Sequence, residues 1–449
     1  MLLLSVDSLR RDFVSAYGYR SPFRPGEPST PAVDALAREG VLFEDAASTT
    51  SWTLPSHAAL LTGLPDRLHG LTGPRDRLDP ALVTLAELLA ERGYAAAGFW
   101  SGPNLHPAFG FSQGFEPYEN CSHVEVPLEL FQSEEVGVFR GVHGESHRDV
   151  TSERLVERSA AWIRGVVERG EGPFFAFVHW WDPHYDYLPP APYDRMFDPE
   201  YDGTVDGSNF IGSREPWSGR DVAHLQSLYA GEIRYTDDHV ARLLELLEEL
   251  GVGDDTLVVF TSDHGDEFYE HGKKGHQRNL YDEVVRIPLV MRWRGGLPAG
   301  VRARGHARLQ DVYTTVTDLL DLPLPDYVEG RSLRPLWEDP GHPGFPQPLH
   351  LEVPFKDIHL EGLRTRRFKA VWDHVAGQGE WFDLDSDPEE TAPTVFHDLQ
   401  GDPHPAVALL RETMAALDAR AERVPRTDGH GGELLPEALV EELRRLGYL

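Results

Sequence analysis

Short apolar segments alternate, up to about Leu336, with segments in which apolar residues recur every three or four positions. The first pattern is typical of buried strands and the second of amphipathic helices. The predicted strands are Leu2–Val6, Ala95–Phe99, Phe174–His179, Thr256–Thr261 and Ile287–Arg292. The predicted helices are Pro31–Gly40, Leu82–Arg92, Glu153–Glu168 and His239–Leu250. Strands and helices that alternate at this spacing predict an α/β fold, with a mainly parallel sheet and helices on both faces.

The pattern changes beyond Leu336. The stretch EDPGHPGFPQP is rich in proline and glycine and is typical of a linker. A small antiparallel sheet is predicted from the short alternating segments His350–Val353, Arg367–Trp372 and Glu380–Asp383. Two further helices are predicted at Ala406–Ala421 and Pro436–Leu446. We therefore expect a larger domain over residues 1–340 and a small C-terminal α+β domain over residues 341–449.

The charge of the chain restricts its partners. Its 449 residues include 42 Lys and Arg against 74 Asp and Glu, a formal net charge of −32. This balance argues against nucleic acid as a partner, which needs a basic surface, and against docking on an anionic membrane. A small anionic substrate remains compatible, provided that a local positive feature such as a metal ion meets it. With Cys121 as the only cysteine, no intrachain disulfide can form.

The first residues hold a short apolar run. It spans Leu2–Val6 and ends at Asp7, which makes it too short for the apolar region of a signal peptide. No apolar run approaches the roughly 18–20 residues of a membrane span. The sequence therefore favours a soluble, cytoplasmic protein, unless a natural leader has been removed.

Acidic residues follow two of the predicted strands. Asp7 comes directly after the first strand, and Asp263 and His264 come after Thr256–Thr261. Because the carboxyl ends of neighbouring parallel strands lie at one edge of the sheet, where ligands bind, these side chains could form a divalent-metal site. The alternative is that they are loop residues or helix caps. That alternative is favoured for Asp7 taken alone, whereas for Asp263 and His264 together the two interpretations are about equal.

A hydroxyl-rich turn precedes the segment AALLTG, which is helical in pattern. Pro55 suits the first turn of this helix, and Thr53 stands at its start. A hydroxyl there meets free backbone N–H groups and the positive end of the helix dipole, which suits an anion. The alternative is that Thr53 or Ser51 is a helix cap, and local sequence alone favours the cap.

A third group of polar residues follows the strand Phe174–His179. The segment HWWDPHYDY supplies His179, Asp182, His184 and Asp186 in an aromatic setting, as candidates for a general acid, substrate contacts or metal ligands. The alternative is a loop whose polar residues cap turns, which is favoured for Asp186. Further along, His271 or His276 could be a third metal ligand or a substrate contact.

In this order, the segments resemble the sulfatase branch of the alkaline phosphatase superfamily. The resemblance covers nearly the whole chain, through SVDSLRRDFVSAYGY, STPAVDALAREGVLFEDA, TLPSHAALLTG, FVHWWDPHYDY, SDHG, LYDEVVRIPLV, VEGRSLRPLW and LRTRRFKAVWD…GEWFDLDSDPEET. It implies an alkaline-phosphatase-like catalytic domain over residues 1–340 and the family's small C-terminal domain over residues 341–449.

The resemblance also implies roles for individual residues. Thr53 stands where sulfatases carry the cysteine that is oxidised to formylglycine, and threonine is the nucleophile of phosphodiesterase relatives. The implied metal ligands are Asp7, Thr53, Asp263 and His264. His57 replaces the family's arginine near the nucleophile, and is a candidate substrate contact.

Other positions depart from the sulfatase pattern. Fewer carboxylates and an added imidazole favour Zn²⁺ or Mn²⁺ over Ca²⁺. One metal site is expected, and a second is possible through Asp182, His184 and His276. His184 and His276 are the candidates for protonating the leaving group, and Asp182 is a candidate substrate contact. Asn104 stands near the place of the family's Lys-x-His element and is the remaining candidate substrate contact.

These residues together predict a metal-dependent hydrolase of phosphate or phosphonate esters with Thr53 as nucleophile, and with sulfate esters as a lesser activity. Three alternatives remain open. The first is a sulfuric-ester hydrolase that works without formylglycine, and the second is a transferase that passes the phosphoryl group to an alcohol. The third is a non-catalytic binding protein on the same fold, suggested by the altered arginine and lysine positions.

Overall fold

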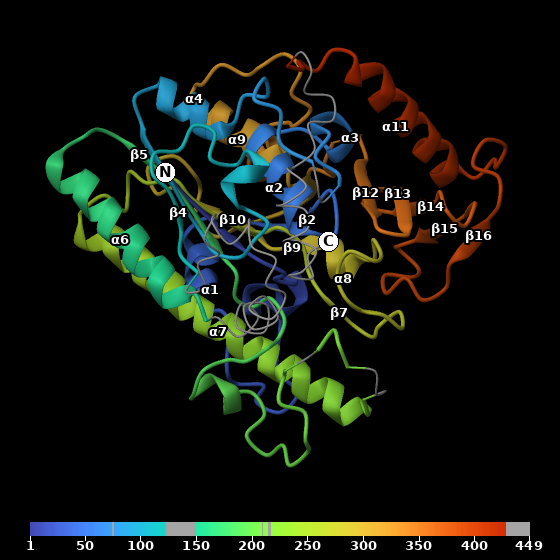
Figure 1. Ribbon diagram of the computed structural model, residues 1–449, viewed down its shortest axis with the longest axis horizontal. Helices are drawn as coiled ribbons and strands as arrows, with labels where there is room; N and C mark the ends of the chain where they lie inside the picture. Colours follow the sequence, from blue (N-terminus) through green and yellow to red (C-terminus); the bar gives the residue numbers. More distant parts are fainter. Residues whose placement is uncertain (74–75, 123–149, 209, 214–216, 346, 428–449) are drawn as a thin grey trace, which may run out of the picture.

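The structure is a computed structural model that describes residues 1–73, 76–122, 150–208, 210–213, 217–345 and 347–427. It contains a large mixed sheet flanked by helices and, towards the C-terminus, a smaller antiparallel sheet (Figure 1). The predicted helix Pro436–Leu446 lies outside the described residues.

The large sheet is mainly parallel, as predicted. Its strand order is β11-β2-β10-β6-β1-β5-β3-β4, and β9 also pairs with β2. Strand β10 runs antiparallel to both of its neighbours, whereas β6, β1, β5 and β3 run parallel to one another. In chain order, these strands are β1 Leu2–Val6, β2 Val41–Ala47, β3 Ala95–Trp100, β4 Tyr118–Asn120, β5 Phe174–Trp180, β6 Val258–Ser262, β9 Arg286–Ile287, β10 Leu289–Arg292 and β11 Val301–Arg308. The α/β fold class is therefore confirmed.

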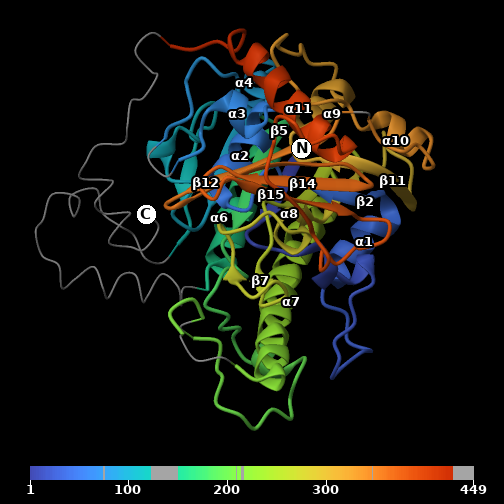
Figure 2. The same ribbon diagram turned by 90° about the vertical axis from the view of Figure 1, so that its right-hand side faces the viewer.

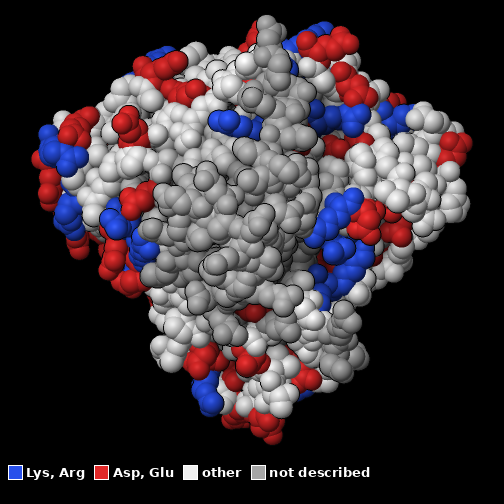
Figure 3. Space-filling model, viewed as in Figure 1, with Lys and Arg blue, Asp and Glu red and all other residues white. Residues whose placement is uncertain are grey.

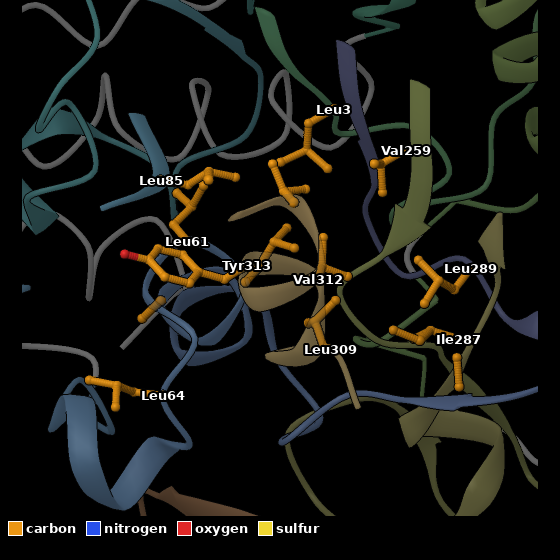
Figure 4. Packing of buried hydrophobic residues seen from close by; sticks show 14 of the residues in the cluster. Leu3, Leu61, Leu64, Leu85, Val259, Ile287, Leu289, Leu309, Val312 and Tyr313 are labelled. Atoms are coloured by element: carbon orange, nitrogen blue, oxygen red, sulfur yellow. The ribbon is translucent and has the colours of Figure 1, made fainter. Parts of the chain in front are cut away.

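Helices cover both faces of this sheet because successive strand residues point to opposite sides. Leu2 and Leu4 of β1 belong to a core formed with α1 (Pro31–Glu39), α6 (Ser152–Arg169) and α7 (Gly219–Glu249). Leu3 belongs to the opposite core, formed with α2 (Thr53–Thr62), α4 (Leu85–Glu91) and α9 (Asp311–Leu319). In this second core, Leu61 of α2 lies close to Tyr313 of α9 (Figure 4). The C-terminal half of α2 is thereby anchored in the protein interior.

Two predicted helices differ from the structure in their bounds. Helix α4 begins at Leu85 instead of Leu82, because Thr84 and Glu87 form a capping box that fixes its start. Helix α7 begins at Gly219, twenty residues before the predicted start at His239. Its N-terminal half buries polar residues, including His224 and Glu232, so that the apolar periodicity on which the prediction depended is lost there.

The smaller sheet is antiparallel, as predicted, in the order β12-β13-β14-β15-β16. Figure 2 shows it facing the viewer, together with α11 (Pro405–Ala421). Its strands are β12 Leu349–Phe355, β13 Ile358–Arg364, β14 Phe368–Asp373, β15 Gln378–Asp383 and β16 Thr394–Phe396. The domain boundary at residue 340 stays a prediction.

Shorter elements connect these layers. They are α3 Asp66–His69, β7 Glu267–Phe268, β8 Lys274–Gly275, α8 Asp282–Val285 and α10 Arg334–Glu338. Within the described residues, no helix combines the length and the apolar character needed to cross a membrane. The cytoplasmic location stays a prediction.

Candidate active site

Two carboxylates meet at the carboxyl edge of the large sheet. Asp7 follows β1 and Asp263 follows β6, and these strands are paired in parallel. Asp263 Oδ1 accepts hydrogen bonds from the backbone N–H of Ser8, at 3.1 Å, and of His264, at 2.9 Å. Ser8 reaches this position with a φ of 56°, in the left-handed region. The backbone after each strand therefore orients the carboxylate of Asp263, as the sequence interpretation required.

Thr53 is the first residue of α2, and its hydroxyl lies against these groups. Its Oγ1 donates to Asp7 Oδ2 at 3.2 Å and lies 3.3 Å from His264 Nε2. The alternative role as a helix cap is not realised. The N-cap position is Trp52, and no side chain caps this helix end. The hydroxyl is thus directed at the carboxylate and the imidazole.

The donor set fits a divalent metal ion. One ligand atom from each of Asp7, Asp263 and His264 lies within 4.8 Å of the others, and all three residues are fully buried. Among the described residues, Asp263 Oδ2 has no hydrogen-bond partner. Burial raises the pKa of Asp7 to about 6. Buried carboxylates of this kind are costly unless a cation compensates them, and a bound divalent ion would do so.

Two histidines, His57 and His179, lie beside this donor set. His57 Nδ1 contacts the carbonyl oxygen of Thr53 at 2.9 Å, and its Nε2 contacts Ser5 Oγ at 3.0 Å. The ring of His179 lies 4.6 Å from that of His57, and its Nε2 lies 3.6 Å from Asp7 Oδ2. Burial lowers the pKa of His57 to about 3 and that of His179 to about 4, so both rings are neutral. The contacts of His57 fix the start of α2, and its predicted role as a substrate contact stays a prediction.

The predicted proton donors, His276 and His184, lie together. Their ring centroids are 5.1 Å apart, and the ring of His276 is 4.4 Å from that of His264. His276 Nδ1 contacts Asp266 Oδ1 at 2.6 Å, and Trp181 stacks on His184 at 3.7 Å. The structure thus brings both histidines to the side of His264, which is compatible with their predicted role.

The other two predicted substrate contacts are also buried. Asp182 follows β5, and its Oδ2 accepts hydrogen bonds from the backbone N–H groups of Thr151 and Ser152 at 3.1 and 2.9 Å. It therefore binds the start of α6. Asn104 lies in the loop after β3 and is 7% exposed. The substrate-binding roles of Asp182 and Asn104 stay predictions.

The smaller sheet supports the segment that leads to Thr53. The backbone N–H of Glu352, in β12, donates to the carbonyl oxygen of Thr49 at 3.0 Å, and Thr50 Oγ1 donates to the carbonyl oxygen of Glu352 at 2.6 Å. The ring of Trp52 packs edge-on against Phe355 at 5.6 Å. The nucleophile candidate is therefore held between α2 and a strand that lies 300 residues later in the chain.

Sequence reasoning missed the positions of His179 and Asp266. His179 was a candidate only as one member of the segment HWWDPHYDY and was given no role of its own, although it is a polar residue inside a buried strand and pairs in register with Ser5. Asp266 Oδ2 accepts a hydrogen bond from Tyr187 at 2.6 Å, and its other oxygen orients His276. In the sequence, Asp266 could have been found as a candidate from its place directly after the SDHG segment.

Comparisons with known proteins identify the family of the chain. The family model "Sulfatase" matches residues 1–322, and the model "N-sulphoglucosamine sulphohydrolase, C-terminal" matches residues 270–415. The chain belongs to the sulfatase family. As a member of this family it is an ester hydrolase, and its active site is of a metal-dependent type.

Individual relatives carry several activities. The chain is 27% identical, over 96% of each chain, to the multifunctional alkaline phosphatase superfamily protein PehA of Trinickia caryophylli. It is 26% identical to an ulvan-active sulfatase of Formosa agariphila, over 81% of this chain and 72% of the relative. The phosphonate monoester hydrolase of Agrobacterium radiobacter has the same fold, with a TM-score of 0.72, 24% identity, and coverage of 94% of this chain and 95% of that chain.

Proposed function

We propose that this sulfatase-family member hydrolyses phosphate or phosphonate esters with Thr53 as its nucleophile. The observation that carries the proposal is the position of the Thr53 hydroxyl, 3.2 Å from Asp7 Oδ2 and 3.3 Å from His264 Nε2 at the start of a helix. The Cβ of threonine carries a methyl group, so oxidation of its hydroxyl would give a ketone and not the aldehyde of formylglycine. The hydroxyl can attack phosphorus directly once its proton is removed.

Four residues would hold one divalent ion: Asp7, Thr53, Asp263 and His264. When bound, the ion lowers the pKa of the hydroxyl and neutralises charge on a non-bridging oxygen of the substrate. One imidazole nitrogen beside two carboxylates is a donor set that Zn²⁺ and Mn²⁺ accept more readily than Ca²⁺. A second ion near Asp182, His184 and His276 belongs to the same proposal only as an alternative.

The residues then act in a defined order. Thr53 Oγ1 forms a bond to phosphorus in line with the leaving oxygen, and its proton passes to Asp7 Oδ2, which already accepts its hydrogen bond. The bond from phosphorus to the leaving oxygen breaks, and His276 or His184 donates a proton to that oxygen. Water then attacks phosphorus and gives a proton to the same histidine, while the bond from phosphorus to Thr53 Oγ1 breaks and Asp7 returns its proton to that oxygen. If an alcohol takes the place of water, the same steps make the protein a transferase.

Charge near the site favours a monoanionic ester. His57, which replaces an arginine of the family pattern, is neutral at physiological pH because burial lowers its pKa to about 3. Asn104 supplies no charge in place of a lysine. Figure 3 shows Asp and Glu side chains in several groups on one face, with Lys and Arg between them, so the net charge of −32 does not form one continuous acidic surface there. Because neither His57 nor Asn104 supplies a positive charge, a phosphodiester or phosphonate monoester suits this site better than a dianionic monoester.

Two substitutions at one position test the nucleophile. Thr53→Val keeps the shape of the side chain but removes the hydroxyl, and we expect it to lower kcat by a factor on the order of 10³ or more. Thr53→Ser keeps the hydroxyl and should retain most of the rate. Hydrolysis of p-nitrophenyl phenylphosphonate, bis-p-nitrophenyl phosphate and p-nitrophenyl sulfate is measured with Mn²⁺, Zn²⁺ or Ca²⁺ after chelation. Equal rates for Thr53→Val and the unsubstituted protein would refute the proposal, and a preference for the sulfate ester would favour the sulfuric-ester alternative.

A further inference from the structure

The smaller sheet carries a cluster of imidazoles and carboxylates that the active site does not use. We call it the histidine–glutamate cluster, and its members are His350, Glu352, His359, Glu361 and His374. They come from β12, β13 and the turn after β14, far from the metal ligands in sequence. Glu352 pairs directly with Glu361, and Glu361 pairs with Trp372, two residues before His374. All five side chains therefore point to one face of the sheet.

Two histidine–glutamate hydrogen bonds lie next to each other in this cluster. His359 Nε2 is 3.0 Å from Glu352 Oε1, and His374 Nε2 is 2.9 Å from Glu361 Oε2. The two imidazole rings stack with centroids 4.3 Å apart. One ligand atom from each of His359, Glu361 and His374 lies within 4.8 Å of the others. Small movements of these side chains would bring four donor atoms to tetrahedral positions around one ion, where bonds are about 2.0–2.2 Å.

Glu352 is compensated less completely than Glu361, which accepts hydrogen bonds from His350, His374 and Arg67. Glu352 and Glu361 face each other in adjacent strands and are 6% and 0% exposed. Like charges directly opposite each other destabilise a sheet. Within the part of the chain that the structure describes, Glu352 Oε2 and His350 Nδ1 are buried without a hydrogen-bond partner. Of these two atoms, Glu352 Oε2 belongs to a proposed ligand, and its side chain is more than nine-tenths buried, so this unpaired oxygen points to a cation at this place.

Other contacts would support a bound ion from outside. Glu361 Oε1 accepts hydrogen bonds from His350 Nε2 at 2.9 Å and from Arg67, in α3, at 3.0 Å. These contacts orient the carboxylate and leave its Oε2 directed at His374, which is the usual arrangement of an outer shell around a metal site. The side chains of His359 and His374 are 37% and 32% exposed, so an ion can reach them from solvent.

We propose that the histidine–glutamate cluster binds one divalent transition-metal ion, with His359, His374, Glu352 and Glu361 as ligands. Two imidazole nitrogens and two carboxylate oxygens in tetrahedral reach are a ligand set that favours Zn²⁺ over Mg²⁺ or Ca²⁺. The ion would join β12, β13 and the end of β14. Its role is structural, because β12 also carries the backbone contacts to Thr49 and Thr50 before the nucleophile candidate.

Zinc stoichiometry tests this proposal without reference to hydrolysis. The full chain is chelated, dialysed against ZnCl₂ and analysed for metal content and protein concentration. The double variant H359Q/H374Q should bind one zinc equivalent less than the unsubstituted chain. His397→Gln, an exposed histidine of the same region, is the matched control and should lose none. Adding Asp263→Asn to both H359Q/H374Q and the control removes the zinc bound at the active site from each. Their zinc contents should still differ by one equivalent.

Equal zinc contents of H359Q/H374Q and the control would overturn the proposal. A second measurement uses the unsubstituted chain, so its result does not depend on the folding of a variant. Anomalous diffraction at the zinc edge, from crystals soaked in ZnCl₂, should give a peak between His359 and His374. A map with no peak at that place would also overturn the proposal.

Discussion

Removing the Arg364 side chain should destabilise the fold strongly, because this buried guanidinium connects the two sheets. Its Nε and Nη2 donate to the two oxygens of Asp282, in α8, at 2.9 and 2.8 Å. Its Nη1 donates to Asp45 Oδ1, in β2, at 3.0 Å. The side chain is 4% exposed, and the nearby guanidinium holds the pKa of both carboxyl groups well below their usual range.

The magnitude follows from what would remain after Arg364→Ala. Three charge-assisted hydrogen bonds are lost, each contributing about 1.5–3 kcal/mol in general. The two carboxylates would not be left without a partner, because Lys369 still contacts Asp282 at 2.8 Å and His306 still contacts Asp45 at 3.1 Å. We therefore expect the free energy of unfolding to fall by about 3–5 kcal/mol, the usual cost of breaking a buried ion pair.

Urea unfolding followed by near-UV circular dichroism measures this effect. The matched control is Arg366→Ala, an exposed arginine two residues along the chain, for which a change within about 0.5 kcal/mol is expected. Arg364→Lys should recover only part of the loss, because an ammonium group cannot reproduce the two parallel contacts to Asp282. If Arg364→Ala and Arg366→Ala unfold at the same urea concentration, the reasoning about this contact is wrong.

Two further predictions concern the turn at the metal ligands and the pH dependence of stability. A Cβ at Gly265 would lie 2.1 Å from the carbonyl oxygen of Glu283. Gly265→Ala should therefore displace the turn and lower kcat/KM by about 10²-fold. At Gly219 nothing lies within 4 Å of an added Cβ, so Gly219→Ala should leave kcat/KM unchanged. Equal kcat/KM for the two variants would contradict this. Burial raises the pKa of Asp237 to about 7, so the folded state binds a proton that the unfolded state releases above pH 4. The free energy of unfolding should therefore fall as pH rises from 4 to 7, by at most about 1.4 kcal/mol per pH unit. Asp237→Asn should flatten this slope in urea titrations. Asp255→Asn, a substitution of an exposed residue, should leave the slope unchanged.

The sequence predicted the elements whose signal is local. Strand β1 has the predicted bounds because five consecutive buried residues read as an apolar run, and α11 begins one residue before the predicted start. The sequence also predicted that Asp7 and Asp263 meet, because both follow parallel strands. Polar residues buried in the N-terminal half of α7, such as Glu232, conceal its helical periodicity, so its start could not be found in this way.

The site was harder to predict where contacts depend on distant segments. The orientation of His276 by Asp266, and the position of His179 beside Asp7, depend on how β5 and the segment after β6 pack. The spacing of residues along the chain carries no information about those distances. The direction of the Thr53 hydroxyl likewise depends on the start of α2 lying over the end of β1, which is why local sequence favoured a helix cap. The resemblance to the sulfatase branch, seen in the sequence, supplied the order of motifs, and the structure supplied their contacts.

The backbone contacts between β12 and the segment before Thr53 restrict how this chain can be divided. The carbonyl oxygen of Thr49 and the hydroxyl of Thr50 are both bound by Glu352, in the smaller sheet. A truncated protein that ends before β12 would retain the four proposed ligands of the active-site metal, the nucleophile candidate among them. It would nevertheless expose the polar groups beside them and lose the packing of Trp52 on Phe355. The C-terminal region thus supports the segment that carries the nucleophile candidate, and any engineering by domain exchange has to transfer β12 together with that segment.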